Sequence, residues 1–394
     1  MQATRLSRSA RWAVPAVAVV VTGGAIAGSV ITVAQAAPDL PPKTPAQLLA
    51  DIASTHKIPA LTGTVVETAS LGLPALPQTG NPNSLASLIT GSHTIKVYWQ
   101  DATHFRLALP QTMSETDVIR DASTAWIWDS ASNSVTKFSV AADGKPGAAK
   151  AAKAKAQLPP LTPQQAANDA LQAVGKTTVV SVDSAVTVAG QAAYELVLAP
   201  KDSRSTIGSI RIAIDGTTGV PLRVQAFAKG AGSPAFQIGY TEISYGAPAA
   251  SNFTFTPPPG AAFDDTTKPQ AGKKAAQEPA LDGTSGTYGS GWLTVAEVPQ
   301  SLLSMTGTTP ATSPAGTSAG SPGTGAFGAD GQAAISAFLG AGKTVSGSWG
   351  TGQLIHTSLV NVLIVGNEMY VGAVDPSVLY AAVGHATPAG TPGD

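Results

Sequence analysis

The feature that most constrains the fold is a series of short segments in which apolar and polar residues alternate. In one such run, Ile95, Val97 and Trp99 alternate with Lys96 and Tyr98. After a polar turn at 100–103, the same alternation continues from Phe105 to Leu109. This period of two is typical of strands with one buried face, and the short turn predicts a hairpin. Similar runs occur at 118–120, 125–128, 135–140, 178–188, 193–199, 210–214, 221–228 and 235–245. Because short turns and no crossover helices join them, we expect a mainly antiparallel sheet.

Two helices are expected beside this sheet. Each begins with the pattern Thr-Pro-x-Gln, once at Thr44 and once at Thr162. The threonine can cap the first turn, proline suits the first helical position, and the glutamine can reach back as in a capping box. We therefore expect helices at 45–56 and 163–174, which makes the fold mainly antiparallel β with α (α+β).

The 394-residue chain is long enough for two or three domains. After the N-terminal segment we expect a main domain at 43–265, a polar linker at 266–285 and a small C-terminal α+β unit at 286–384. In that unit the Thr/Ser/Gly/Pro-rich stretch 305–330 predicts a disordered insert. The rest of this C-terminal unit should consist of a helix near 331–340, a hairpin at 360–374 and a helix beginning at Pro376.

The N-terminal segment has the layout of a secretory signal. Arg5, Arg8 and Arg11 precede an uncharged stretch from Trp12 to Val33, and a small-x-small site follows at 34–36. The uncharged stretch is also long enough to cross a membrane as a helix. Residues 1–36 therefore predict a signal peptide or a retained N-terminal membrane anchor. Either places the rest of the chain on the extracytoplasmic side, secreted or anchored.

Composition excludes several kinds of site. The chain has no cysteine, which rules out disulfides, thiolate metal ligands and a cysteine nucleophile. Its five histidines are far apart in sequence and lack the spacing of metal ligands. A formal net charge of −1 offers nucleic acid no electrostatic attraction. Gly-x-Ser-x-Gly occurs once, at 316–320, inside a Thr/Ser/Gly/Pro-rich stretch where no strand-to-helix turn is expected. We expect no cofactor, no metal, no nucleic-acid partner and no enzymatic activity.

Two sequence patterns imitate catalytic or nucleotide sites. Residues 340–344 read Gly-Ala-Gly-Lys-Thr, like the end of a phosphate loop, but Ala337 stands where its first glycine is required. We therefore expect no nucleotide binding. Glu115 and Asp117 lie two apart, as an acid–base pair on one strand face would. Carboxylate pairs of this kind are far commoner on exposed faces, so we expect a surface pair.

Aromatic side chains on neighbouring strands are the remaining candidates. A period of two places Trp126 and Trp128 on one face, where they would join Trp99 and Phe105. Two interpretations stay open: an ordinary core, or a partly open apolar cavity for acyl chains. Burying a chain stabilises by about 0.8 kcal/mol per CH₂, so a cavity of this kind needs no catalytic group. The candidates to line it are Trp99, Phe105, Leu107, Leu109, Trp126, Trp128, Phe138, Ile210 and Ile212.

Three segments carry a family resemblance. The block at 252–260, Asn-Phe-Thr-Phe-Thr-Pro-Pro-Pro-Gly, with Asp264 and Asp265 after it, resembles the C-terminal signature of the lipoprotein carrier family LolA. We expect a last short strand at Phe253 to Thr256, ended by the prolines. The stretch 118–129 is similar to that family's strand-turn-strand. The stretch 214–222 is similar to a turn of the wider superfamily, which includes the periplasmic regulator RseB.

The resemblance covers about residues 43–265 and implies an incomplete β-barrel covered by helices, with a cavity for lipid chains and no enzymatic activity. The helices at 45–56 and 163–174 would form its lid. The implied function is binding of lipid or of lipoprotein acyl chains. One alternative is an RseB-like regulator that binds an anti-sigma factor or another membrane protein, and a second is a non-catalytic envelope scaffold. One departure is clear: the family's arginine near the first hairpin turn is absent from Gln100-Asp101.

Overall fold

The computed structural model describes residues 38–54, 58–72, 90–140, 162–165, 167, 175–265, 286–300, 340 and 342–385. Several expectations lie outside these residues: the signal or anchor at 1–36, the linker at 266–285, the insert at 305–330, most of the helix at 163–174 and nearly all of the helix near 331–340. Among the helices of the described residues, none has the length and apolar character needed to cross a membrane.

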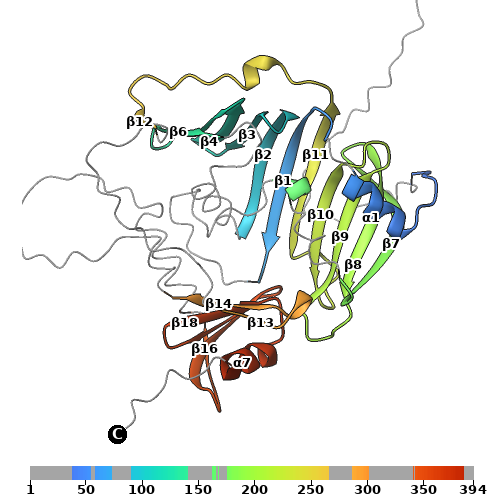
Figure 1. Cartoon of the computed structure of the whole chain (residues 1–394), viewed down its shortest axis with the longest axis vertical. Coiled ribbons are helices and arrows are strands. Elements are labelled where there is room, and N and C mark those ends of the chain that lie inside the picture. The colour runs from blue at the N-terminus through green and yellow to red at the C-terminus, as the bar shows by residue number, and fades with distance from the viewer. Residues whose placement is uncertain are drawn as a thin grey trace, which may run out of the picture. The chain divides into compact units, whose positions relative to one another are not determined.

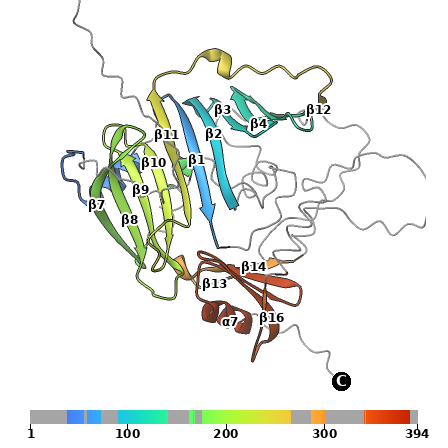
Figure 2. The same ribbon diagram turned by 180° about the vertical axis from the view of Figure 1, so that it is seen from behind.

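Most strands belong to one large, strongly curved sheet (Figures 1 and 2). Its order is β12-β6-β5-β4-β3-β2-β1-β11-β10-β9-β8-β7, and all neighbours pair antiparallel except β12 with β6. The strands are β1 Leu61–Ser70, β2 Thr90–Asp101, β3 His104–Pro110, β4 Glu115–Asp121, β5 Thr124–Asp129, β6 Ser134–Ser139, β7 Thr178–Val188, β8 Gln191–Pro200, β9 Ile207–Asp215, β10 Pro221–Ala228, β11 Phe236–Tyr245 and β12 Ala262–Asp265. The sheet is open, with β12 and β7 at its edges, which confirms the expected antiparallel α+β fold with an incomplete barrel.

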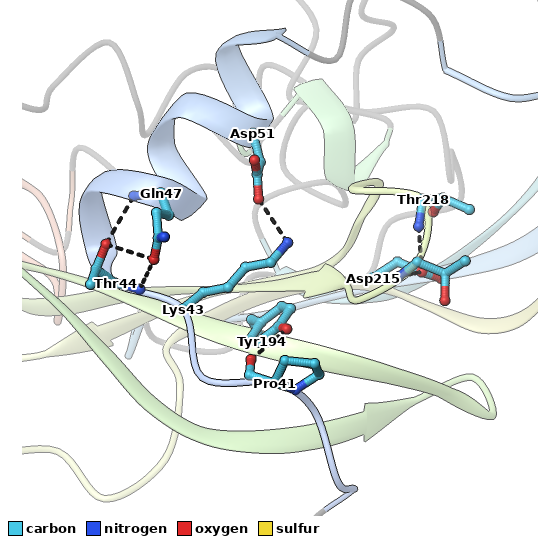
Figure 3. Close-up of polar contacts among 9 residues, drawn as sticks. Pro41, Lys43, Thr44, Gln47, Asp51, Tyr194, Asp215 and Thr218 are labelled. Carbon is cyan, nitrogen blue, oxygen red and sulfur yellow. Dashed lines mark hydrogen bonds and ion pairs between the residues drawn. The ribbon is translucent and has the colours of Figure 1, made fainter.

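Helix α1, Pro45–Ser54, forms as its sequence predicts. The Gln47 backbone N–H donates to Thr44 Oγ1 at 3.2 Å, and the Thr44 backbone N–H donates to Gln47 Oε1 at 2.8 Å. This is the reciprocal capping box drawn in Figure 3. The same pair of bonds joins Thr162 and Gln165, each at 3.2 Å. The chain before α1 is held by Tyr194, whose hydroxyl donates to the Pro41 carbonyl at 2.7 Å.

The end of the large sheet differs from the expectation at one place. Residues Phe253 to Thr256 are not a strand; a short 3₁₀ helix, η1 at Ala250–Asn252, precedes them and an irregular segment follows. The three prolines at 257–259 cannot donate the bonds that a ladder needs. The chain therefore crosses the sheet without pairing and joins it only at β12.

A smaller, six-stranded sheet has the order β13-β14-β18-β17-β16-β15, with every neighbouring pair antiparallel. The β17–β18 hairpin turns at Gly366, whose φ of 60° suits glycine. Helix α7, Pro376–His385, covers this sheet with Leu379, Ala382 and Val383 buried. The elements are β13 Gly286–Tyr288, η2 Gly291–Leu293, β14 Val295–Pro299, β15 Lys343–Gly347, β16 Gly350–His356, β17 Asn361–Val365 and β18 Glu368–Gly372.

Backbone and side-chain contacts join the two sheets. Ser205, in the connection between β8 and β9, forms an antiparallel bridge with Val374. The Asp375 N–H donates to the Arg204 carbonyl at 2.7 Å. Trp292 of η2 is buried within the core cluster of the large sheet, and its Nε1–H donates to Thr178 Oγ1 at 2.8 Å. One tryptophan from the smaller unit thus completes the core of the larger one.

Candidate binding face of the large sheet

The inner face of the large sheet is the face against which α1 packs, and we define it as the face that bears Val65. Directly opposed residues of antiparallel strands carry their side chains on the same face. Val65 is opposed by Ile95 on β2 and by Tyr240 on β11. Leu48 of α1 belongs to the same buried cluster. The register then follows this face across the antiparallel strands, from β6 to β7.

The inner face on β8, β9 and β10 is closed by the chain itself. Leu196 and Ile212 are fully buried there, and Ile210 is partly buried beside them. Leu48 and Ile52 of α1 lie in the same cluster. The cavity candidate Ile212 therefore sits in a packed core, and Ile210 lies at the edge of that core.

The inner face on β2 to β6 keeps several apolar side chains only half-buried. Trp99 and Phe105 are directly opposed, and their rings stack with centroids 5.8 Å apart. Leu107 follows on the same face and is buried. Trp99 Nε1 is buried and has no hydrogen-bond partner among the described residues. The half-buried members, called the apolar patch below, are Trp99, Phe105, Leu109, Val118, Ile127 and Phe138.

Two cavity candidates lie on the opposite face. Phe105 is opposed by Arg120, and Arg120 by Ala125, so it is Ala125 and Ile127 that point inward from β5. Trp126 and Trp128 point outward, sharing a face as expected, but not the face of Trp99 and Phe105. The expectation that all these aromatic residues line one surface is thereby corrected. A shift of one residue exchanges the two faces of a strand, and local sequence does not define that register.

The outward tryptophans are covered by the segment that follows η1. The Phe255 ring centroid lies 5.5 Å from that of Trp126 and 6.1 Å from that of Trp128. Phe263 of β12 lies 6.2 Å from Trp126. The Phe-Thr-Phe-Thr-Pro-Pro block therefore acts here as a cover for the outer face.

The carboxylate pair on β4 is also on the outer face, and one member is buried. Asp117 is 0% exposed, and Arg106 donates hydrogen bonds to Asp117 and, at 3.2 Å, to Glu115. Burial and the contact with Glu115 raise the pKa of Asp117 to about 7, although Arg106 opposes this shift. The expected solvated surface pair is thus a buried acid beside an arginine, away from the apolar patch.

A further buried acid, Glu67, was not identified from sequence. It occupies an inward position of β1, where Leu61, Gly63, Val65 and Ala69 are the other buried residues. Neither of its carboxyl oxygens has a hydrogen-bond partner among the described residues. Burial raises the pKa of Glu67, and His93, directly opposed on β2, acts in the other direction. The sequence did contain a signal for it: in the alternating segment of β1, Glu67 stands at a position where the pattern predicts a buried apolar residue.

A cavity of about 440 Å³ lies at the junction of the two sheets. Trp292, Tyr288 and Val378 line it together with Arg204, which pairs with Asp202 at 2.7 Å. Within the described part of the chain, no group of three His, Asp or Glu side chains is arranged to hold a metal ion.

No protein-family model and no curated protein matches the chain. Among solved structures, one of the Pseudomonas aeruginosa MucA/MucB complex is 15% identical with a TM-score of 0.39, covering 86% of this chain and 96% of that chain. A LolA superfamily protein from Nitrosomonas europaea is 8% identical with a TM-score of 0.19, covering 54% and 99%. An uncharacterised conserved protein from Thermus thermophilus is 11% identical with a TM-score of 0.31, covering 56% and 98%.

At TM-scores below 0.5, these likenesses carry no residue's role over to this chain. The solved structures similar to this chain thus include MucB and a LolA superfamily protein.

Proposed function

We propose that the protein is an extracytoplasmic, non-catalytic binding protein that holds the acyl chains of a lipid or lipoprotein against the apolar patch. The observation that carries this proposal is the contrast along the inner face. Where α1 packs, Leu196 and Ile212 are fully buried, whereas from β2 to β6 six apolar side chains are only half-buried, four of them packed against the same core cluster. Apolar surface left partly in water is stabilised when a hydrocarbon covers it.

The chemistry of the patch suits an acyl chain. Its six members are aromatic or aliphatic, and each methylene buried against them contributes about 0.8 kcal/mol. The Asp117–Arg106 pair lies on the other face, and the charged side chain of the inner face on β4 is Arg120, which lies between Phe105 and Ala125. Export follows from the N-terminal sequence, which we propose acts as a signal or anchor.

Native mass spectrometry of the purified protein and titration with a fluorescent fatty acid test this function. We expect co-purified lipid and saturable uptake. Ile127→Asp, which places a carboxylate in the patch, should weaken uptake at least tenfold. Lys96→Asp, on the outward, exposed side of β2, is the matched control and should bind as the parent does. A lipid-free mass together with no uptake by the parent protein would reject the proposal.

A second candidate is an RseB-like regulator that binds a membrane protein such as an anti-sigma factor. The observation that favours it is the smaller sheet, which is joined to the large one through Ser205 and Trp292 and forms a cavity with it. Site-specific crosslinking in membranes from a cysteine placed at Ala381, which lines this cavity, should then capture one defined membrane protein. If neither lipid nor membrane protein is captured, a non-catalytic envelope scaffold remains.

A further inference from the structure

Glu67 is an acidic side chain buried on the inner face of the large sheet. It is 1% exposed and lies on the inner face of β1 between Val65 and Ala69, which are also buried. The register places Ile238 directly opposite on β11 and, beyond it, Val224 on β10. Its row across the sheet is therefore apolar except for His93 on the other side.

Both carboxyl oxygens of Glu67 lack a hydrogen-bond partner within the described residues. A buried carboxyl group without partners is unfavourable whether it is ionised or neutral, because water no longer satisfies it. Other buried acids of the large sheet have donors: Glu195 accepts from Arg211 and Arg223, Asp215 from Tyr245, and Asp117 from Arg106 on one of its two oxygens. The carboxyl oxygens of Glu67 can therefore accept hydrogen bonds from a donor on a bound molecule.

Resting on the function proposed above, we propose that Glu67 anchors the head group of the bound amphipathic molecule, and that this head group is a hydrogen-bond donor, either a hydroxyl or an ammonium group. An anionic head group would place a second negative charge where burial already disfavours the ionised form of Glu67. A donor satisfies the oxygens that the fold leaves free, and an ammonium group also compensates the charge.

The dimensions of the inner face fit this arrangement. Trp99 is opposed by Leu61, which precedes Glu67 by six residues on the same strand. At the rise of a β-strand, the two rows are about 20 Å apart. The hydrocarbon would lie along the apolar patch, with the head group at the Glu67 row. Arg120, a cation on the inner face, lies in the Trp99 row, away from the Glu67 row, and its Nε–H donates to the Ala122 carbonyl at 3.1 Å.

Three probes with the same ten-carbon chain test the proposal: decanol, decylamine and decanoate. Each is used below its micellar concentration to displace a neutral fluorescent probe, N-phenyl-1-naphthylamine, from the full-length protein. We expect decanol and decylamine to bind the parent protein about tenfold more tightly than decanoate, since one charge-assisted hydrogen bond is worth about a factor of ten or more. The two donor probes separate a hydroxyl from an ammonium ligand.

Three variants test whether the Glu67 side chain causes the preference for decanol and decylamine over decanoate. Glu67→Leu should reduce the preference for the donor probes to within about twofold. Glu67→Gln, which keeps an acceptor and loses the charge, should retain decanol binding and lose most of the gain for decylamine. Glu242→Gln is the control, because this exposed glutamate is on the outward side of the adjacent strand β11 and should leave all three affinities unchanged.

The outcomes separate this inference from the function on which it rests. Equal affinities of the three probes for the parent protein, or tighter binding of decanoate, would overturn the role of Glu67 and leave the acyl-chain function intact. An unchanged preference in Glu67→Leu would overturn it too. If no probe binds, the acyl-chain function itself fails. The comparison in the parent protein needs no variant to fold.

Discussion

At the scale of single residues, the large sheet buries acids on both faces and treats them differently. Glu195 accepts from two arginines, Arg211 at 2.8 Å and Arg223 at 3.0 Å, while Asp117 has Arg106 on one oxygen and no partner on the other among the described residues. Removing one partner of such a pair leaves an uncompensated buried group and is costly. Because the pKa of Asp117 is raised to about 7, the free energy of unfolding should depend on pH.

The sign of that dependence follows from the raised pKa. Between pH 4 and 7 the folded protein holds a proton on Asp117 that the unfolded chain has released, so stability falls as pH rises through this window. Asp117→Asn should flatten the fall, which we expect to be on the order of a few kcal/mol in the parent. Urea unfolding at pH 4, 5.5 and 7 measures it, with Glu242→Gln as the exposed control. A parent protein that gains stability over this range would contradict the assignment.

At the scale of elements, α1 depends on its first turn. Thr44→Ala removes the hydroxyl that accepts the Gln47 N–H and should lower the free energy of unfolding by about 1 kcal/mol. Thr44→Ser keeps the acceptor and should stay within a few tenths of a kcal/mol of the parent. Equal losses in the two variants, measured by denaturant unfolding, would mean that the cap contributes nothing.

The segment after η1 covers Trp126 and Trp128, and this role can be tested by mutation. Phe255→Ala should uncover Trp126 and Trp128, shift tryptophan emission to the red and cost about 1–2 kcal/mol, because two aromatic contacts are lost. Phe263→Ala is the matched comparison: Phe263 is 48% exposed and contacts Trp126 alone of the two. If Phe263→Ala has the larger effect, Phe255 is not the main cover.

Local sequence was sufficient to predict individual strands and helices, but not which remote segments pack against them. The alternation around Ile95 and the Thr44 capping box predict β2 and α1 because both signals are contained within a few residues. The covering of Trp126 and Trp128 depends on the remote segment that carries Phe255. That segment begins more than 120 residues later. Its covering role is a tertiary contact, which the local pattern of β4 and β5 does not encode.

At the scale of the whole molecule, Trp292 connects the smaller sheet to the core of the larger one. Trp292→Ala should cost about 3–5 kcal/mol, since it empties a buried site. It should also split unfolding into two transitions, as the sheets lose their shared core residue. Trp292→Phe keeps most of the packing and loses only the bond to Thr178, so its cost should be about 1 kcal/mol. Calorimetry that shows one transition in all three proteins would contradict this coupling.

The parallel addition of β12 to β6 has a consequence for the molecule in solution. A bare sheet edge invites pairing with another chain and leads to aggregation. On one side, β12 covers β6 with only four residues, two of them Asp264 and Asp265, so the exposed edge is short and negatively charged. On the other, the register of β7 breaks after Asp183, which makes that edge a poor template. Both flanks of the curved sheet are thereby protected against self-association.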